Sequence, residues 1–188
     1  MVMTPADYAT AAAIAVLGAW SWWHATRMAR AEAEVIAENI EQGFTDELPH
    51  DVLVWWRIEW IGSAWAAVGL VMGWWVNWWL LLPLAAIAWA VFTLRHRYAL
   101  NRARGFDWRY VAPGNNYDRF WMRVSGECMR RPDTWTARNW SAFVKLQHDH
   151  GYDLDDLRRQ RVHRAGLLAY AFEVLVATGA VVVAMWIA

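Results

Sequence analysis

The segment WWVNWWLLLP, residues 74–83, places four tryptophans around a short polar unit and follows them with three leucines and a proline. It lies in a run of thirty-five residues, Trp60 to Leu94, that contains no ionisable side chain. A membrane-spanning helix needs about 20 apolar residues, so this run is too long for one crossing and fits two joined by a tight turn. Indole rings prefer the headgroup layer of a bilayer. The segment therefore predicts the turn of a transmembrane hairpin, anchored in one interface by Trp74, Trp75, Trp78 and Trp79.

Two further apolar segments bring the expected number of membrane crossings to four. The first follows Thr4 and Pro5, residue types that favour a helix start, and the last runs from Ala165 to Ala188. A cleaved signal peptide is not expected, because no basic residue precedes the first segment and no small-residue cleavage site ends it. The sequence predicts an all-α integral membrane protein with a small helical cytoplasmic cap and four transmembrane helices, over residues 6–26, 52–73, 77–95 and 165–187.

The polar parts of the chain complete the expected organisation. We expect the first transmembrane helix to continue as an acidic cytoplasmic extension as far as Gly43, because apolar residues recur there at helical spacing. In the third region, Asn116, Asp133 and Asp153 stand where short helices could begin. The predicted regions are the first helix with its extension (1–51), the hairpin with its external tip (52–95), a basic and aromatic cytoplasmic region (96–164) and the fourth transmembrane helix (165–188).

The distribution of basic residues predicts the orientation. Of the eighteen Lys and Arg residues, fifteen lie between the third and fourth predicted spans, and the other three are Arg27, Arg30 and Arg57. Basic residues favour the cytoplasmic side. We therefore expect an inner-membrane protein with the N-terminus, the hairpin tip and the C-terminus outside and the connections 27–51 and 96–164 in the cytoplasm. A second aromatic belt at the cytoplasmic interface would include Trp22, Trp23, Trp55 and Trp56.

The two cytoplasmic connections carry opposite charge. Residues 27–51 contain two basic and seven acidic side chains, whereas residues 95–165 contain fifteen basic and eight acidic ones. This pattern predicts that the acidic residues 32–47 dock on the basic region. It fits equally well a basic surface that binds anionic lipid headgroups.

Three charged residues fall inside the predicted spans, namely Arg57, Glu59 and Glu173. Charges at such depth are usually paired or functional. We expect Glu173 to face the bundle interior and to pair with Arg57. The alternative for this layer is a proton or ion path.

Histidines form the second group of candidate site residues. His24, His50, His96 and His163 each lie near the cytoplasmic end of one predicted span. We expect no metal or haem on them, because Arg97 and Arg164 stand close by and repel cations, and the HxxxH and HxxHH boxes of membrane desaturases are missing. A metal, if bound at all, would be held by His148, His150 and Asp153. No cofactor is expected.

The motifs of common enzyme classes are absent from the sequence. It has no phosphate-binding glycine loop, CxxC, GxSxG or HExxH. The aromatic residues of the arginine-rich segment 104–120 are expected to be interfacial anchors or the core of a small cap domain, and not a nucleic-acid-binding surface. We expect a non-catalytic membrane subunit that scaffolds, anchors or regulates a larger assembly, with the bilayer, other integral subunits or further copies of itself as partners. The alternatives are a channel-like, holin-like or proton-coupled transport component, and a metal-dependent membrane oxidoreductase.

Overall fold

The computed structural model of the chain describes residues 3–41, 50–105, 107–110, 116–125 and 163–188. Over these ranges the regular structure is entirely helical, which confirms the predicted all-α class. The helices are α1 (Pro5–Glu41), α2 (His50–Trp75), the 3-10 turn η1 (Trp78–Leu80), α3 (Leu81–Ala103), α4 (Asn116–Val124) and α7 (His163–Ile187).

Two helical stretches are long and apolar enough to cross a membrane. They are Trp78–Ala103, which joins η1 to α3, and Arg164–Ile187 in α7. Helix α2 is as long as these stretches but is not one of the two. It contains six tryptophans, whose indole N–H makes them amphipathic, and it begins with the polar residues His50 and Asp51. The structure thus supports a membrane location through two helices.

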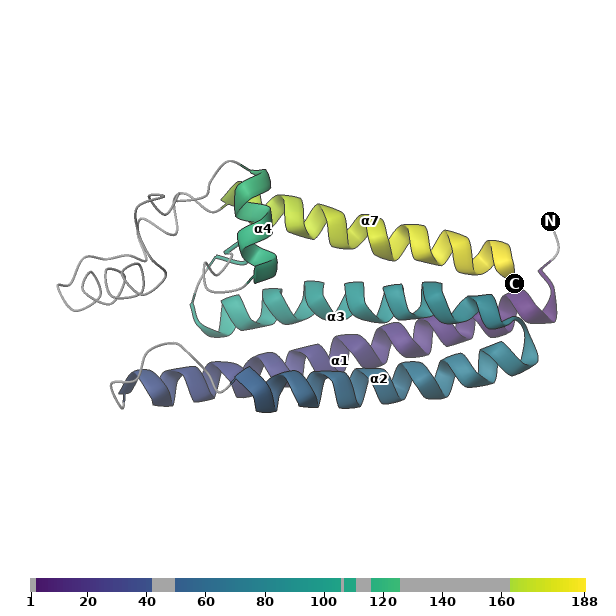
Figure 1. The fold of residues 1–188 in the computed structure, drawn as a ribbon, viewed down its shortest axis with the longest axis horizontal. Helices are drawn as coiled ribbons and strands as arrows, with labels where there is room; N and C mark the ends of the chain where they lie inside the picture. The colour runs from purple at the N-terminus through teal and green to yellow at the C-terminus, as the bar shows by residue number, and fades with distance from the viewer. Residues whose placement is uncertain (1–2, 42–49, 106, 111–115, 126–162) are drawn as a thin grey trace. The chain divides into compact units, whose positions relative to one another are not determined.

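The chain divides into two compact units, Met1–Arg104 with Ala171–Ala188, and Gly105–Tyr170. In the first unit α1, α2 and α3 lie side by side, and α1 makes its most extensive contact with α3. Successive helices run in opposite directions, so the start of α1, the α2–α3 turn and the end of α7 gather at one end (Figure 1). This is the arrangement expected when the N-terminus, hairpin tip and C-terminus share one side.

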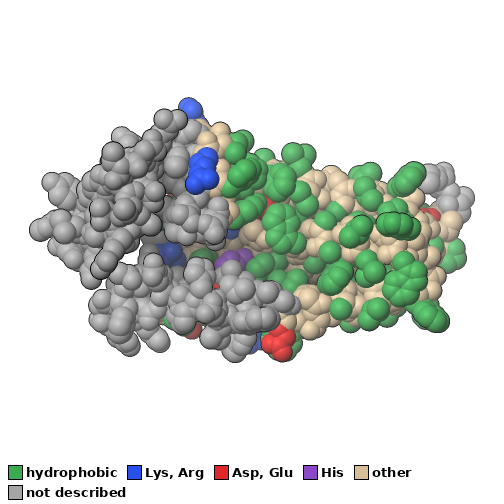
Figure 2. All heavy atoms as spheres, viewed as in Figure 1, with side chains coloured by type: hydrophobic (Ala, Val, Ile, Leu, Met, Phe, Trp, Pro, Cys, Tyr) green, Lys and Arg blue, Asp and Glu red, His purple; other side chains and the backbone are tan. Residues whose placement is uncertain are grey.

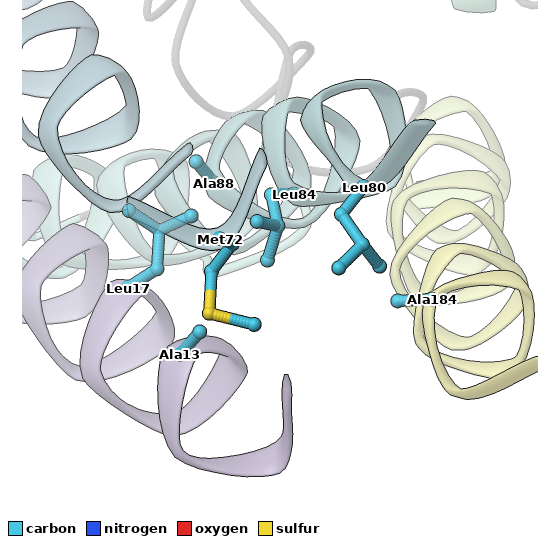
Figure 3. Packing of buried hydrophobic residues seen from close by; sticks show 7 residues of the cluster. All are labelled: Ala13, Leu17, Met72, Leu80, Leu84, Ala88 and Ala184. Carbon is cyan, nitrogen blue, oxygen red and sulfur yellow. The ribbon is translucent and has the colours of Figure 1, made fainter. Parts of the chain in front are cut away.

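The core of this first unit lies at the end that carries the turn. Residues from α1, α2, η1, α3 and α7 meet there as one buried cluster (Figure 3), comprising Ala13, Leu17, Met72, Leu80, Leu84, Ala88 and Ala184. Leu80 and Leu84 are fully buried; burial of such a side chain from water contributes about 1.5–3 kcal/mol, whereas between helices in a bilayer the contribution comes from van der Waals packing. A second cluster joins Ala25, Met28 and Phe92.

The α2–α3 turn has the position predicted from the tryptophan segment. Helix α2 ends at Trp75, and the Asn77 side chain caps η1 by accepting a hydrogen bond from the Trp79 backbone N–H at 3.1 Å. Gly73 is required here, since a Cβ at that position would collide with the indole of Trp78. The indole N–H of Trp65 donates to the carbonyl of Leu81 at 3.0 Å, which ties α2 to α3.

Two helices are longer than the predicted spans. Helix α1 continues from the expected crossing to Glu41, as the helical spacing of its extension predicted. Helix α3 was expected to end at residue 95, with a cytoplasmic connection from residue 96, but it continues to Ala103. The reason is that His96, Arg97 and Asn101 are buried in the bundle instead of entering solvent.

The second unit is organised around the start of α7. The Tyr170 hydroxyl donates to the carbonyl of Trp108 at 2.8 Å, and the two rings lie 5.0 Å apart. Asp107 accepts two hydrogen bonds from the Arg109 guanidinium, at 2.9 and 3.0 Å, which raises the pKa of Arg109 above its ordinary value. Gly166 lies directly under the Arg109 carbonyl, and a Cβ at Gly166 would overlap that oxygen.

Replacing Gly166 by alanine should therefore destabilise the protein. The obstructing atom is a backbone oxygen, which cannot rotate away, so we expect a loss of about 1–3 kcal/mol, as for other overpacked sites. The measurement is the thermal unfolding midpoint of the detergent-solubilised protein.

The matched control is Gly179→Ala in the same helix, where nothing lies within 4 Å of the added Cβ. Its midpoint should stay unchanged or rise slightly, since alanine favours helix more than glycine. Equal midpoints for the two variants would contradict the close approach of Arg109 to α7.

Candidate functional site

The outer surface of the bundle is apolar and rich in exposed aromatic side chains. Figure 2 shows hydrophobic side chains covering much of the bundle on the face in view. The four tryptophans of the turn are strongly exposed, with Trp74 and Trp75 each 79% accessible. A shallow hollow there is lined by Asn77, Trp79, Trp186 and Ile187, which places the end of α7 beside the turn. These aromatic side chains lie where the sequence predicted interfacial anchors.

Polar side chains are buried on the inner faces of the helices, and an ion pair joins two of them. The Arg97 Nη2 of α3 lies 3.1 Å from the Glu173 Oε1 of α7, and the Glu173 side chain is completely buried. Both residues fall inside the two apolar stretches that could cross a membrane. Glu173 thus faces the interior, as expected, and Arg97 is a partner that the sequence analysis did not name, whereas the side chain of the predicted partner Arg57 lies outside the described residues.

A second buried pair joins α1 to α3. The Nε2 of His96 lies 3.1 Å from the Oε2 of Glu32, whose side chain is 3% exposed. This contact links the first residue of the acidic segment 32–47 to the basic region 95–165. It lies within the helical bundle, and the predicted docking of the two segments stays a prediction because most of their residues lie outside the described part of the chain.

His24 of α1 is buried beside these two pairs. Its ring packs against Phe92 with a centroid separation of 6.0 Å, and Phe92 in turn stacks on His96 at 5.3 Å. In the described part of the chain, His24 Nε2 has no hydrogen-bond partner, although the residue is only 7% exposed. The candidate site is this buried polar group, defined as His24, Glu32, His96, Arg97 and Glu173.

The buried polar group lies far from the tryptophan turn. At ~1.5 Å per residue, α3 rises about 28 Å between Trp78 and Arg97, close to the thickness of the hydrocarbon core. The group would therefore lie toward the opposite interface if α3 crosses a bilayer. Each carboxylate of the group has an arginine or a histidine as its hydrogen-bond donor, as expected for ionisable groups removed from water.

The remaining predicted site residues have varied positions. Glu59 is exposed, and its carbonyl accepts a hydrogen bond from the Ser63 hydroxyl. Trp22 and Trp23 are each 47% exposed. Helices α2 and α7 begin at His50 and His163, but the structure does not describe the side chains of His50, Trp55, Trp56, Arg57 and His163. The predicted metal ligands His148, His150 and Asp153, and the helices expected after Asp133 and Asp153, lie outside the described residues.

The positions of the described histidines can be compared with those that a metal site requires. Within the described residues, no three His, Cys, Asp or Glu side chains are close enough to hold a metal ion. His24 and His96 both contact Phe92, and His96 is directed to Glu32. Their arrangement is that of an aromatic and ionic contact between helices.

The sequence analysis missed two members of the buried polar group, Arg97 and Glu32. Both had been assigned to the solvated connections. The apolar stripe of α3 provides the signal that could have found Arg97, because Pro83, Ile87 and Ala90 are buried and the helical repeat continues to Arg97. No comparable signal in the sequence identifies Glu32 among the five glutamates of segment 32–47.

Comparison of the chain with protein-family models, with curated proteins and with solved structures finds no match.

The Arg97–Glu173 pair makes a quantitative prediction. Arg97→Gln or Glu173→Gln alone should lower the free energy of unfolding by about 3 kcal/mol, because each leaves a buried charge without its partner. The double variant should lose less than the sum of the two, with a coupling energy of at least about 1 kcal/mol. Equilibrium unfolding in mixed detergent micelles measures all three values.

Glu59→Gln is the control, since that side chain is exposed and its neutralisation should change stability by less than about 0.5 kcal/mol. Strict additivity of the Arg97 and Glu173 substitutions would rule out the pair as a stabilising contact.

Proposed function

We propose that this chain is a non-catalytic integral membrane subunit that scaffolds, anchors or regulates a larger membrane assembly. In this proposal all four long helices cross the inner membrane, α1 and α2 as well as the two apolar stretches. The turn and both termini lie outside, and the connections 27–51 and 96–164 lie in the cytoplasm. The up-and-down order of the helices and the asymmetry of basic residues support this topology.

The observation that carries the proposal is that α7 has one side in contact with the bundle and an opposite side that is exposed and apolar. One side is fastened to the bundle by the Arg97–Glu173 pair and by Ala184 in the core cluster. The other side presents large apolar residues, with Leu175 70%, Val182 63% and Trp186 87% exposed. An ion pair fixes the rotation of α7 about its axis, so this outer face is held in one direction, as a surface that receives another membrane helix requires.

The internal polar groups support a structural role as well. The charged side chains of the buried polar group are used in contacts between the protein's own helices, α1 with α3 and α3 with α7. Buried polar contacts of this kind specify which helices are neighbours. A bundle held in this way presents a defined outer surface to partners.

Site-specific photocrosslinking in native membranes tests the proposal. A benzophenone amino acid at Leu175 or Val182 should yield protein adducts of defined mass, because both side chains point away from the bundle. The matched controls are the neighbouring Val176 and Val181, which are half-buried and should yield much less. Mass spectrometry of the adducts identifies the partner, which can be a second copy of the chain.

Adducts to lipid alone at both exposed positions would contradict a scaffold role for α7. A second candidate, a proton-coupled transport component, is favoured by one observation, the buried His24 Nε2 without a partner in the described residues. Proton flux through liposomes that contain only this chain, together with lipid-only adducts, would support the second candidate instead.

A further inference from the structure

Two arginines, Arg27 of α1 and Arg95 of α3, make cation–π contacts with tryptophan rings of α1. The guanidinium of Arg95 lies over the Trp22 ring at 4.5 Å and over Tyr98 at 5.4 Å. The guanidinium of Arg27 lies over the Trp23 ring at 5.0 Å. Trp22 and Trp23 are consecutive on α1, so the two cations are held at the same level along that helix.

The Arg95 side chain is fixed at its Nε. This atom donates to the Thr26 hydroxyl at 2.9 Å, and Thr26 itself donates to the Trp22 carbonyl at 2.9 Å. The contact with Thr26 uses one of the five guanidinium N–H groups, and the terminal Nη groups keep the other four. Within the part of the chain that the structure describes, neither Arg95 nor Arg27 pairs with a carboxylate.

Stacking leaves the edge of a guanidinium available. Its N–H donors lie in the plane of the group, so a ring beneath it does not block them. Two parallel N–H groups match the spacing of two phosphate oxygens and bind them as a bidentate pair. Two uncompensated positive charges on adjacent tryptophans therefore form a surface that suits a phosphate group with net negative charge.

The surroundings favour a lipid as the source of that phosphate. Before Trp22, the helix presents exposed apolar residues such as Val16, which is 60% accessible, and its only charged residue there is Asp7. After Trp23 the charged residues begin, with Arg27, Arg30 and Glu32. The stacked arginines thus lie at the border between an apolar and a charged surface, which is where a headgroup phosphate lies above its acyl chains.

We infer that Arg27 and Arg95, stacked on Trp23 and Trp22, form a binding site for the phosphate of an anionic glycerophospholipid. The exposed apolar residues before Trp22 contact the acyl chains, and the terminal Nη groups of Arg95 together with the Arg27 guanidinium bind the headgroup. This inference uses the membrane placement of α1 from the proposed function, but it does not depend on a protein partner.

The test measures lipid binding to the full chain purified in detergent. Short-chain phosphatidylglycerol is titrated, and the rise of the thermal unfolding midpoint gives the apparent affinity. Phosphatidylcholine of the same chain length and inorganic phosphate are titrated in parallel. We expect a saturable rise with phosphatidylglycerol that exceeds the rise with either of the other two.

The variants separate a built site from general attraction. Arg27→Gln combined with Arg95→Gln should weaken phosphatidylglycerol binding by at least about tenfold, the loss expected for two charge-assisted contacts. The control combines Arg102→Gln with Arg123→Gln, which removes the same charge from two exposed positions and should leave the affinity within about twofold of the parent. If the Gln double variant fails to fold, the double variant Arg27→Lys with Arg95→Lys tests the site instead. Its ammonium groups keep the charge but lose the bidentate geometry, so phosphatidylglycerol binding should still weaken.

Three results would overturn the inference. They are an equal loss in the control variant, an equal response to inorganic phosphate, and full binding by the Lys variant. None of them affects the crosslinking result on α7, so failure of the lipid site and failure of the scaffold role can be told apart.

Discussion

The ion pair between Arg97 and Glu173 is the contact on which the rest of the bundle depends. Both side chains are buried within the protein, and a buried charge that loses its partner is strongly destabilising, so each of the two residues needs the other. Pairing the two requires that α7 lie against α3 with one face inward. At the other end of the same helices, Ala184 packs in the cluster that contains Leu80. One polar and one apolar contact thus fix both the neighbour and the rotation of α7.

Helical phase gives two nearby arginines opposite roles. Arg95 and Arg97 are two residues apart on α3, which turns them by about 200° around the helix axis. Arg97 is buried and pairs with Glu173, whereas Arg95 reaches the surface of α1 and lies on Trp22. Charge alone therefore does not show which of the two arginines is buried and which reaches the surface; that depends on the rotation of α3 about its axis. The same reasoning separates buried Glu32 from exposed Glu34.

Much of the fold could be predicted because the sequence has long uncharged stretches with clear borders. The tryptophan turn, the starts of α1 and α2 and the extent of α7 agree with the predicted segments to within a few residues. The end of α3 could not be predicted from charge, because Arg95 and Arg97 look like a cytoplasmic border. The spacing of buried residues shows the continuation instead, with Leu84, Ala88, Phe92 and His96 recurring every four residues.

The candidate site was harder to predict than the fold. Sequence analysis identified Glu173 and the helix-end histidines His24 and His96 as special, but it could not choose the partners. Partner choice depends on which helices are adjacent, and α1 lies mainly against α3 rather than against α2, its neighbour in sequence. Arg57 was the expected partner of Glu173 because both stand at a similar depth in the predicted spans. The side chain of Arg57 lies outside the described residues, so that pairing stays a prediction beside the Arg97–Glu173 contact.

The central claim of the proposed function is that the four long helices cross a membrane in alternating directions, which predicts that Asn77 and Ser125 are accessible from opposite sides of it. Labelling of single cysteines with a membrane-impermeant maleimide in intact cells tests this directly, in a Cys128→Ser background. A cysteine at Asn77, in the turn, should be labelled without permeabilisation, and one at Ser125 should be labelled only after it. Labelling of both positions, or of Ser125 alone, in intact cells would contradict the account.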